Sequence, residues 1–368
     1  MRIFSASIGV KGSDYRVYGE IKWHYFADNA DVCTDTGQFT FYDSRAATAH
    51  TTNRSEWRLY YYDDFLSVAE PGDALILTRT QDNTYLCLVF QQGSGWLRAA
   101  SALFGIDANN RSLQSIPEAT LDHQTLNFAQ LQILEELGVE LSAPPAPSDE
   151  DIIVARFGSI FPTTSQMSAF AREQMPQDSA DPDTALIGWL GREEALFRAL
   201  EAVQVRQQLD RGFDSVEHFI SYSLSIQNRR KSRMGHALQN HLAALFTAHN
   251  LRFGPQAFTE GKNKPDFLFP GALEYHDPTF SAARLCMLAA KSSAKDRWRQ
   301  ILTEAARLPE KHLCTLEAGI STDQTTEMAT QGVRLVIPAA LHITYTPSQQ
   351  STLLTLGAFV EYVRSIQT

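Results

Sequence analysis

The stretch that most constrains the fold of this chain is residues 264–291, which read KPDFLFPGALEYHDPTFSAARLCMLAAK. A carboxylate, Asp266, stands directly before one short apolar run, and Lys291 directly follows another. Short apolar runs bounded by proline and glycine are typical of buried strands. If these runs are neighbouring strands of one sheet, Asp266 and Lys291 can reach the same phosphate group. The alternative is a pair of ordinary strands with charged ends.

Hydrolysis of a phosphodiester needs a metal ion that neutralises the phosphate and lowers the pKa of the attacking water. Mg²⁺ prefers oxygen ligands and keeps several waters, so one or two carboxylates and a lysine form a minimal set. A second acid is therefore expected near Asp266 and Lys291, and Glu304 is the candidate. A helix is predicted around 295–308, and on it Arg297 and Glu304 share one face because they are seven residues apart. On spacing alone, a solvated Glu304 remains the alternative.

The first hundred residues differ in character from the rest of the chain. Runs rich in aromatic and β-branched residues, separated by Gly, Asp and Asn, predict short strands at RIFSASIGV, YRVYGEIKWHYF, QFTFYDS, EWRLYYY, DALILTRT and TYLCLVF. Strands at this spacing indicate a barrel or pseudobarrel. The Pro-rich acidic segment 142–151 is typical of a linker. We therefore predict a β-rich domain at 1–142, a linker at 143–152 and a second domain at 153–368.

The second half of the chain predicts an α/β domain with a central mixed sheet flanked by helices. A helix is expected at 183–210, with Asp183 as N-cap and Gly212 as stop. Further elements are expected in the order of two helices within 215–251, the two apolar strands above, a strand at 332–340 and a helix at 351–366. Before the linker, residues 128–141 also show helical period.

Charge and cysteine content restrict the protein class. The formal net charge is -10, which argues against non-specific coating of nucleic acid but leaves room for a local basic groove. No CxxC pair occurs, so we expect free thiols in a reducing cytoplasm at Cys33, Cys87, Cys286 and Cys314. No signal pattern and no apolar run of about 20 residues is present, so no membrane partner is expected and a soluble cytoplasmic protein is predicted.

Five segments identify a family by their order along the chain. They read SIQNRRKSRMGHALQNHLAALF, TEGKNKPDFLFP, YHDPTF, AAKSSAKDRWRQILTEA and GVRLVIPAALH. Over about residues 181–366 they resemble the catalytic domain of the EcoRII-type restriction endonucleases, members of the PD-(D/E)xK nuclease superfamily. The resemblance implies a prokaryotic, Mg²⁺-dependent type II enzyme that makes double-strand breaks in DNA at a CCNGG-like site such as CCWGG.

The resemblance also implies roles for particular residues. Asp266 corresponds to the metal-binding aspartate of the "PD" element, and Lys291 to the lysine of the "xxK" element, where Ala289 replaces the usual acid. Glu304 corresponds to the second metal-binding carboxylate. Gln239 stands where the family has a further glutamate, which puts a second metal site in doubt.

The same resemblance points to residues that contact DNA. Lys295, Asp296 and Arg297 correspond to major-groove readers, in agreement with the pairing of Lys or Arg with guanine and of Asp with cytosine. Tyr275 and His276 match the family's "YHD" and are expected on the DNA-facing side, with a packing role as the alternative.

A run of four cations lies on the predicted helix region before the site, at Arg229, Arg230, Lys231 and Arg233. In this setting it predicts phosphate contacts that supply electrostatic affinity for DNA. A solvated helix face is the alternative.

In the first half, FYDSRAATAHTTNRSEWRLYY resembles the "R-x-E-x-R" segment of the EcoRII-type N-terminal effector domain, a DNA-binding pseudobarrel. Arg54, Glu56 and Arg58 alternate along a predicted strand, so their side chains share one face. Such a face can read guanine and cytosine edges, and the domain would act as an effector or affinity module. A cross-strand salt-bridge ladder is the alternative.

A palindromic target favours a homodimer, and a monomer stays open. Two other functions also remain. Gln239 motivates a DNA-binding protein that keeps the fold but does not cut, and the fold also serves repair and structure-specific nucleases. A small-molecule enzyme has little support, because no GxGxxG, Walker, HExxH or GxSxG element occurs.

Overall fold

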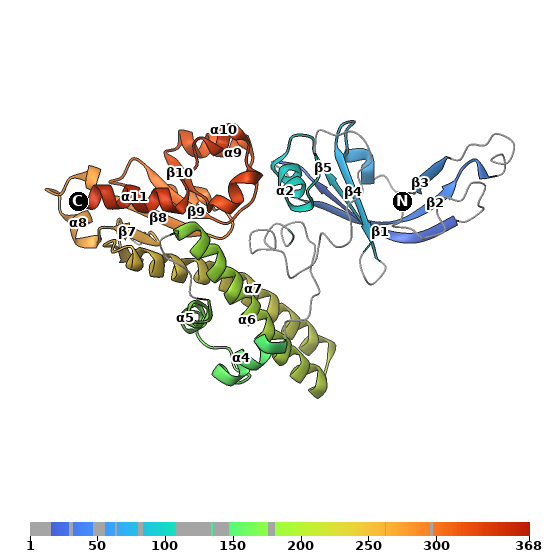
Figure 1. Cartoon of the computed structure of the whole chain (residues 1–368), viewed down its shortest axis with the longest axis horizontal. Helices are drawn as coiled ribbons and strands as arrows, with labels where there is room; N and C mark the ends of the chain where they lie inside the picture. The colour runs from blue at the N-terminus through green and yellow to red at the C-terminus, as the bar shows by residue number, and fades with distance from the viewer. Residues whose placement is uncertain are drawn as a thin grey trace. The chain divides into compact units, whose positions relative to one another are not determined.

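The computed structural model describes residues 16–28, 32–46, 56–62, 65–79, 84–107, 134, 147–175, 181–261, 263–294 and 297–368. These residues form two compact units, which Figure 1 draws in colours that follow the chain. The first unit contains strands β1 to β5, and the second contains the elements from α4 to α11. Each unit is described separately.

The first unit is built on a five-stranded mixed sheet in the order β3-β2-β1-β5-β4. The strands are β1 (Arg16–Phe26), β2 (Cys33–Asp43), β3 (Trp57–Tyr61), β4 (Ala74–Arg79) and β5 (Tyr85–Phe90), accompanied by η2 (Phe65–Val68) and α2 (Gly95–Phe104). β1 runs parallel to β5, and the remaining neighbours are antiparallel.

Buried side chains at alternate positions along these strands form the core of the first unit. One face of β1 and β2 buries Ile21, Trp23, Phe39 and Phe41, because successive side chains of a strand point to opposite faces. Five of the six predicted strands are thereby confirmed. The sixth, RIFSASIGV, and the predicted helix at 128–141, apart from Leu134, lie outside the described residues.

The second unit also contains a five-stranded mixed sheet, in the order β10-β9-β8-β7-β6. Its strands are β6 (Gly254–Pro255), β7 (Phe267–Phe269), β8 (Cys286–Lys291), β9 (Lys311–Thr315) and β10 (Val333–Val336). β8, β9 and β10 run parallel to one another, whereas β7 is antiparallel to both β6 and β8. The two apolar runs of the sequence are therefore adjacent strands, as predicted, with Phe267 opposite Leu288.

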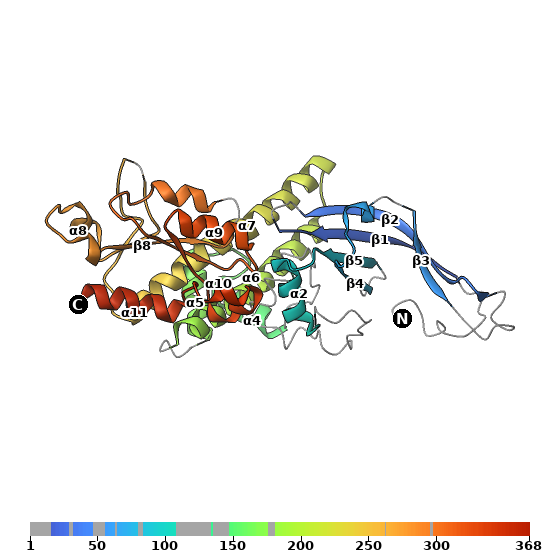
Figure 2. The same cartoon turned by 90° about the horizontal axis from the view of Figure 1, so that it is seen from above.

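Helices surround this sheet. The α-helices are α4 (Pro147–Phe157), α5 (Thr164–Gln174), α6 (Pro182–Arg211), α7 (Val216–Ala248), α8 (Ala272–His276), α9 (Thr322–Thr330), α10 (Pro347–Gln350) and α11 (Leu356–Gln367), and the 3-10 helices are η4 (Ala282–Arg284), η5 (Trp298–Thr303) and η6 (Ala339–Thr344). Both views, Figure 1 and Figure 2, show the long helices α6 and α7 side by side. None of the helices in the described part of the chain is long and apolar enough to cross a membrane.

Several element boundaries differ from the sequence-based expectation. The two helices expected within 215–251 are one continuous helix, α7, because neither proline nor a capping glycine interrupts it and its single Gly235 is tolerated. The expected strand at 332–340 ends at Val336, and the last helix begins at Leu356 rather than 351. α4 begins at Pro147, so the C-terminal part of the segment expected to be a linker is helical.

The N-cap of α6 is Asp181, not Asp183 as expected, and Pro182 occupies the first turn. The Asp183 carboxylate instead accepts hydrogen bonds from the backbone N–H groups of Ala339, Leu356 and Gly357, at 2.8–3.0 Å. It therefore caps the first turn of α11, where a negative charge is favourable.

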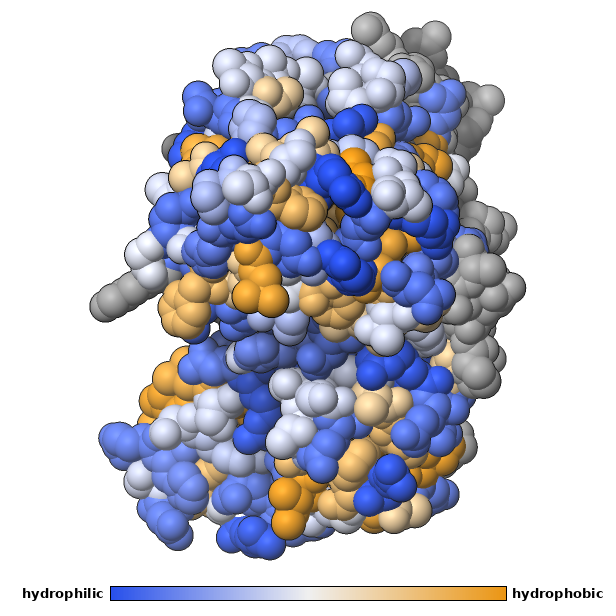
Figure 3. Space-filling model, turned by 90° about the vertical axis from the view of Figure 1, so that its left-hand side faces the viewer, coloured by the Kyte–Doolittle hydropathy of each residue, from blue (hydrophilic) through white to orange (hydrophobic). Residues whose placement is uncertain are grey.

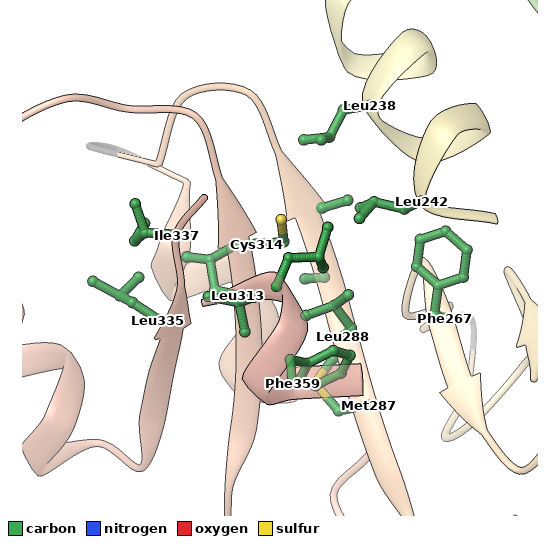
Figure 4. Close-up of a cluster of buried hydrophobic side chains, with 14 of the residues drawn as sticks. Leu238, Leu242, Phe267, Met287, Leu288, Leu313, Cys314, Leu335, Ile337 and Phe359 are labelled. Carbon is green, nitrogen blue, oxygen red and sulfur yellow. The ribbon is translucent and has the colours of Figure 1, made fainter. Parts of the chain in front are cut away.

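The core of the second unit lies between the sheet and the helices. The ring of Phe246 on α7 and that of Phe359 on α11 both pack against Phe269 of β7, with centroids 5.3 and 5.8 Å apart. Figure 4 shows Leu238 and Leu242 of α7 directed into the same layer. This apolar layer fixes α7 against β7 and so fixes the approach of α7 to the start of that strand.

Three of the four cysteines are buried, and all four are free thiols, as predicted. Burial raises the pKa of Cys87 to about 12, which keeps that thiol protonated and unreactive. On the face drawn in Figure 3, apolar residues form small groups separated by polar ones.

Candidate active site

Asp266 lies at the start of β7 and is 6% exposed. Its Oδ2 accepts hydrogen bonds from the Ala290 N–H at 2.7 Å and from Lys291 Nζ at 3.1 Å. Its Oδ1 accepts a hydrogen bond of 2.8 Å from Nε2 of Gln239 on α7. The antiparallel pairing of β7 with β8 brings Asp266 beside the end of β8. The structure thus brings Asp266 and Lys291 together, as the sequence predicted.

Glu304 directly follows η5. Burial raises the pKa of its carboxyl to about 7; the nearby charge of Lys291 acts to lower it and that of Asp266 to raise it further. Glu304 therefore lies within the electrostatic influence of Asp266 and Lys291. Its Oε2 is buried and has no hydrogen-bond partner among the described residues.

The donor set at this site fits a hard cation better than it fits an empty polar pocket. A buried carboxylate oxygen without a partner is costly, and Glu304 Oε2 is such an atom. Carboxylate oxygens are the ligands that Mg²⁺ prefers, and this ion is bound by one or two of them together with waters. Within the described ranges no cluster of three or more His, Cys, Asp and Glu side chains is close enough to hold a metal. The candidate set is therefore limited to the two carboxylates.

The residues expected to read bases in the major groove are only partly described. Lys295 and Asp296 lie outside the described residues, and Arg297 is exposed at the start of η5. The helix expected around 295–308 is wrong: the segment forms the short 3-10 helix η5 and then turns at Ala305, which has a φ of 48°. Arg297 and Glu304 consequently flank the two ends of η5 and do not share a face of one α-helix.

Tyr275 and His276 lie on the short helix α8. Tyr275 is 4% exposed, and its hydroxyl donates to Glu260 and accepts from the Arg307 N–H. The His276 ring bonds the carbonyl of Phe258 at 3.0 Å. Among the described residues, neither side chain forms a hydrogen bond with Asp266 or Lys291, so their role as DNA contacts stays a prediction.

The basic run on α7 divides into different environments. Arg230 pairs with Glu201 through hydrogen bonds of 2.9 and 3.0 Å, and Arg229 bonds Gln204 at 3.1 Å. Arg233 is buried, with 5% of its side chain exposed, and it pairs with Glu194. The structure thus turns Arg233 toward α6 rather than toward solvent, while the side chain of Lys231 lies outside the description.

In the first unit, Glu56 is the centre of an exposed ion cluster. Its Oε2 accepts from Arg45 Nε at 2.8 Å, and its Oε1 accepts from the Arg58 guanidinium at 2.8 Å. These hydrogen bonds, first that of Arg58 and then that of Arg45, lower the pKa of Glu56. Arg54 lies outside the described residues. Sequence reasoning did not include Arg45, because it stands eleven residues before Glu56 and only the chain reversal between β2 and β3 brings them together.

Sequence reasoning also missed Glu260 and Lys311, which surround the segment of Glu304. Lys311 is 6% exposed, and its Nζ donates to the carbonyl of Leu308 at 2.9 Å. Burial lowers the pKa of Lys311. A lysine that opens an apolar strand is the only sequence signal for it, and that signal is weak.

Part of the second unit is similar in sequence to known proteins. Residues 197–360 match the family model described as EcoRII C terminal. The Type II restriction enzyme EcoRII of Escherichia coli is 44% identical over 222 residues, which cover 60% of this chain and 55% of that protein. The chain thus spans about half the length of this curated relative.

Two solved structures extend the comparison. The structure described as metal-depleted Ecl18kI in complex with uncleaved, modified DNA has a TM-score of 0.50 at 18% identity and covers 60% of this chain and 83% of its own. A restriction endonuclease PspGI–substrate DNA complex has a TM-score of 0.48 at 12% identity and covers 58% of this chain and 95% of its own. The fold of the second unit is therefore similar to that of Ecl18kI, and residues 197–360 are similar to the EcoRII C-terminal family.

Proposed function

We propose that this chain is a type II restriction endonuclease that makes Mg²⁺-dependent, sequence-specific double-strand breaks in DNA. The observation that carries the proposal is the contact of Asp266 with Lys291 at the end of β8, with Glu304 in their electrostatic environment, in a segment that matches the EcoRII C-terminal family model. The relative that is 44% identical is named as a type II restriction enzyme. The resemblance of the sequence favours a CCNGG-like target such as CCWGG.

In this mechanism the chain supplies a fixed set of oxygens and one positive charge. Bound Mg²⁺ would neutralise the phosphate and lower the pKa of the attacking water. Asp266, oriented by three hydrogen bonds, and Glu304, through its unpartnered Oε2, would hold the cation. Lys291, with 23% of its side chain exposed, can reach a phosphate oxygen or the water from the end of β8.

DNA binding would involve both units. In the second, we propose that Lys295, Asp296 and Arg297 read bases, with phosphate contacts from the exposed part of the basic run on α7. In the first unit, a mixed sheet that we propose to be a pseudobarrel carries Glu56 and Arg58 beside Arg45. This unit would act as an effector or affinity module for a cytoplasmic homodimer on a palindromic site.

The experiment that tests the proposal is digestion of unmethylated plasmid and phage DNA with Mg²⁺ by the wild type, Asp266→Ala and Lys291→Ala. Discrete fragments that disappear with both variants are expected, and their ends would define the target. Arg252→Met, on an exposed ion pair with Glu274, is the control that should still cut. Smeared or structure-dependent products would instead indicate a repair-type nuclease.

A second function is favoured by one observation. Gln239, a neutral amide, contacts Asp266 where a further carboxylate would strengthen cation binding. A wild type that binds duplex DNA but produces no fragments at any Mg²⁺ concentration would support a DNA-binding protein that keeps the fold without cutting.

A further inference from the structure

The backbone around Glu304 is held by side chains from other segments. Each flanking residue, from Thr303 to Arg307, has one such partner, and Glu304 itself bonds back to the carbonyl of Ile301 at 3.0 Å. Asn263 Nδ2 donates to the Thr303 carbonyl at 2.7 Å, and the Ala305 N–H donates to Thr259 Oγ1 at 3.3 Å. The Ala306 N–H donates to Glu260 Oε2 at 3.0 Å. The Arg307 N–H donates to the Tyr275 hydroxyl at 3.2 Å. The donors and acceptors come from the 259–263 loop and from α8.

Glu260 and Tyr275 connect these bonds into one unit. Glu260 accepts the Tyr275 hydroxyl through Oε1 while Oε2 accepts the Ala306 N–H. Burial, and next the bond to Glu260, raise the pKa of Tyr275 to about 12. The hydroxyl therefore stays protonated at neutral pH and donates to Glu260. One carboxylate thus joins α8 to the residues that follow Glu304.

The bonds oppose a backbone that would otherwise relax. Ala305, directly after Glu304, has a φ of 48°, a left-handed conformation that residues with a side chain rarely adopt. Arg307 anchors the other end, because its guanidinium donates to the carbonyls of Tyr275, Asp277 and Phe280. Without these side-chain hydrogen bonds, the unfavourable φ of Ala305 would favour another backbone conformation, and Glu304 would move with it.

We propose that Glu260 and Tyr275 are positioning residues that hold the Glu304 carboxylate where it can bind the catalytic cation. The inference rests on the proposed nuclease function. It assigns Tyr275, which the sequence resemblance associates with DNA, to the support of a metal-binding carboxylate. The described hydrogen bonds of the Glu260 and Tyr275 side chains reach each other and the backbone after Glu304, and not Asp266 or Lys291, so both residues act through Glu304.

Cation binding can be read without catalysis from the rise in melting temperature on titration with Mg²⁺ or Ca²⁺, since a ligand of the native state stabilises it by mass action. The variants are Tyr275→Phe, Glu260→Gln and the double variant, each in the full chain. Glu274→Gln is the matched control, because Glu274 also lies on α8 but pairs with exposed Arg252. Asp266→Ala defines the response without a working site.

If the two residues position Glu304, each single variant raises the cation concentration for half-maximal stabilisation by about tenfold. The double variant should lose little more than either single variant, because one bond joins the two side chains. A parallel shift of the cation midpoint for cleavage is expected, with Glu274→Gln at the wild-type midpoint. Variants that melt lower but keep the wild-type cation midpoint would overturn the proposal and leave a purely structural role. A wild type without any cation response, like Asp266→Ala, would instead count against the proposed function.

Discussion

Nε2 of Gln239 donates a hydrogen bond of 2.8 Å to Oδ1 of Asp266. The bond joins α7 to the start of β7, and it is possible because the apolar layer around Leu238 and Leu242 fixes that part of α7 against the sheet (Figure 4). With Ala290 and Lys291 on the other oxygen, Asp266 is fully oriented before any cation arrives.

The first prediction concerns this amide. Gln239→Glu would replace a donor by a second carboxylate at hydrogen-bond distance from Asp266, so the cation-free protein should lose about 1–3 kcal/mol of unfolding free energy. Mg²⁺ would then offset the repulsion, and the rise in melting temperature with Mg²⁺ should exceed that of the wild type. Thermal melts with and without Mg²⁺ check this. Gln227→Glu, on the exposed face of α7, should behave like the wild type; an equal Mg²⁺ response in both variants would contradict the prediction.

The second prediction concerns the basic run. Arg233 is buried beside Glu194 and Glu193, and its guanidinium stacks 4.4 Å from the centre of the Phe197 ring. Arg233→Met should cost about 3–5 kcal/mol, because removing one partner leaves buried charge uncompensated. Urea unfolding measures it. Arg252→Met, at an exposed pair, should cost no more than about 1 kcal/mol, and similar losses for the two variants would refute the buried-pair argument.

The environment of Arg233 illustrates where the sequence was informative and where it was not. Asp266 and Lys291 could be singled out from sequence, because each stands at the end of a short apolar run and the order of the surrounding motifs resembles a nuclease family. The run NRRKSR carries no such constraint. Whether an arginine faces solvent or Glu193 depends on how α6 crosses α7, and that crossing is a tertiary property.

The segment after Lys291 was mispredicted for a similar reason. The segment is helical only over Trp298–Thr303, where it forms a 3-10 helix instead of an α-helix, and it ends before the left-handed Ala305. Side chains of Thr259, Glu260 and Tyr275 stabilise that ending, and they lie 32–46 residues before the residues that they bond. Local propensity cannot register bonds of this range, whereas tertiary contacts routinely override it.

The third prediction concerns pH. Burial, with a smaller effect of Arg334, lowers the pKa of His312 to about 4 from its ordinary 6.5. His312 faces the Cys286 thiol on one ring nitrogen and the half-exposed Glu310 carboxylate on the other, at 3.4 Å each, and the Tyr362 ring packs on it. The folded state therefore binds fewer protons than the unfolded state between these values, and stability falls as pH falls.

The contribution of the neutral His312 imidazole to the unfolding free energy is complete above pH 6.5. It is lost progressively down to about pH 4, by about 3 kcal/mol in total. Urea unfolding at several pH values, compared with His312→Leu, measures it as a shallower slope in the variant. His218→Leu, at an exposed histidine, is the control. Identical slopes for wild type and His312→Leu would show that the buried imidazole does not titrate in this range.

The last prediction concerns the first unit. Arg58 and Arg45 share the exposed carboxylate of Glu56, which leaves both guanidinium groups at the surface and fixes the spacing between them. If this cluster reads base edges, Arg58→Ala should weaken binding of specific duplex by about tenfold, and Arg58→Lys should not restore it, since lysine lacks the bidentate fork. Fluorescence anisotropy with an Asp266→Ala background avoids cleavage during the measurement.

The melting temperature should stay at the wild-type value, because exposed ion pairs contribute little to stability. Lys22→Ala removes an exposed cation from β1 of the same sheet and should weaken specific and unrelated duplexes equally, as a phosphate contact would. An Arg58→Ala variant that also weakens both duplexes equally would reduce the cluster to an electrostatic contact. Unchanged affinity for both would mean that the three side chains form only a salt-bridge ladder on a solvated sheet.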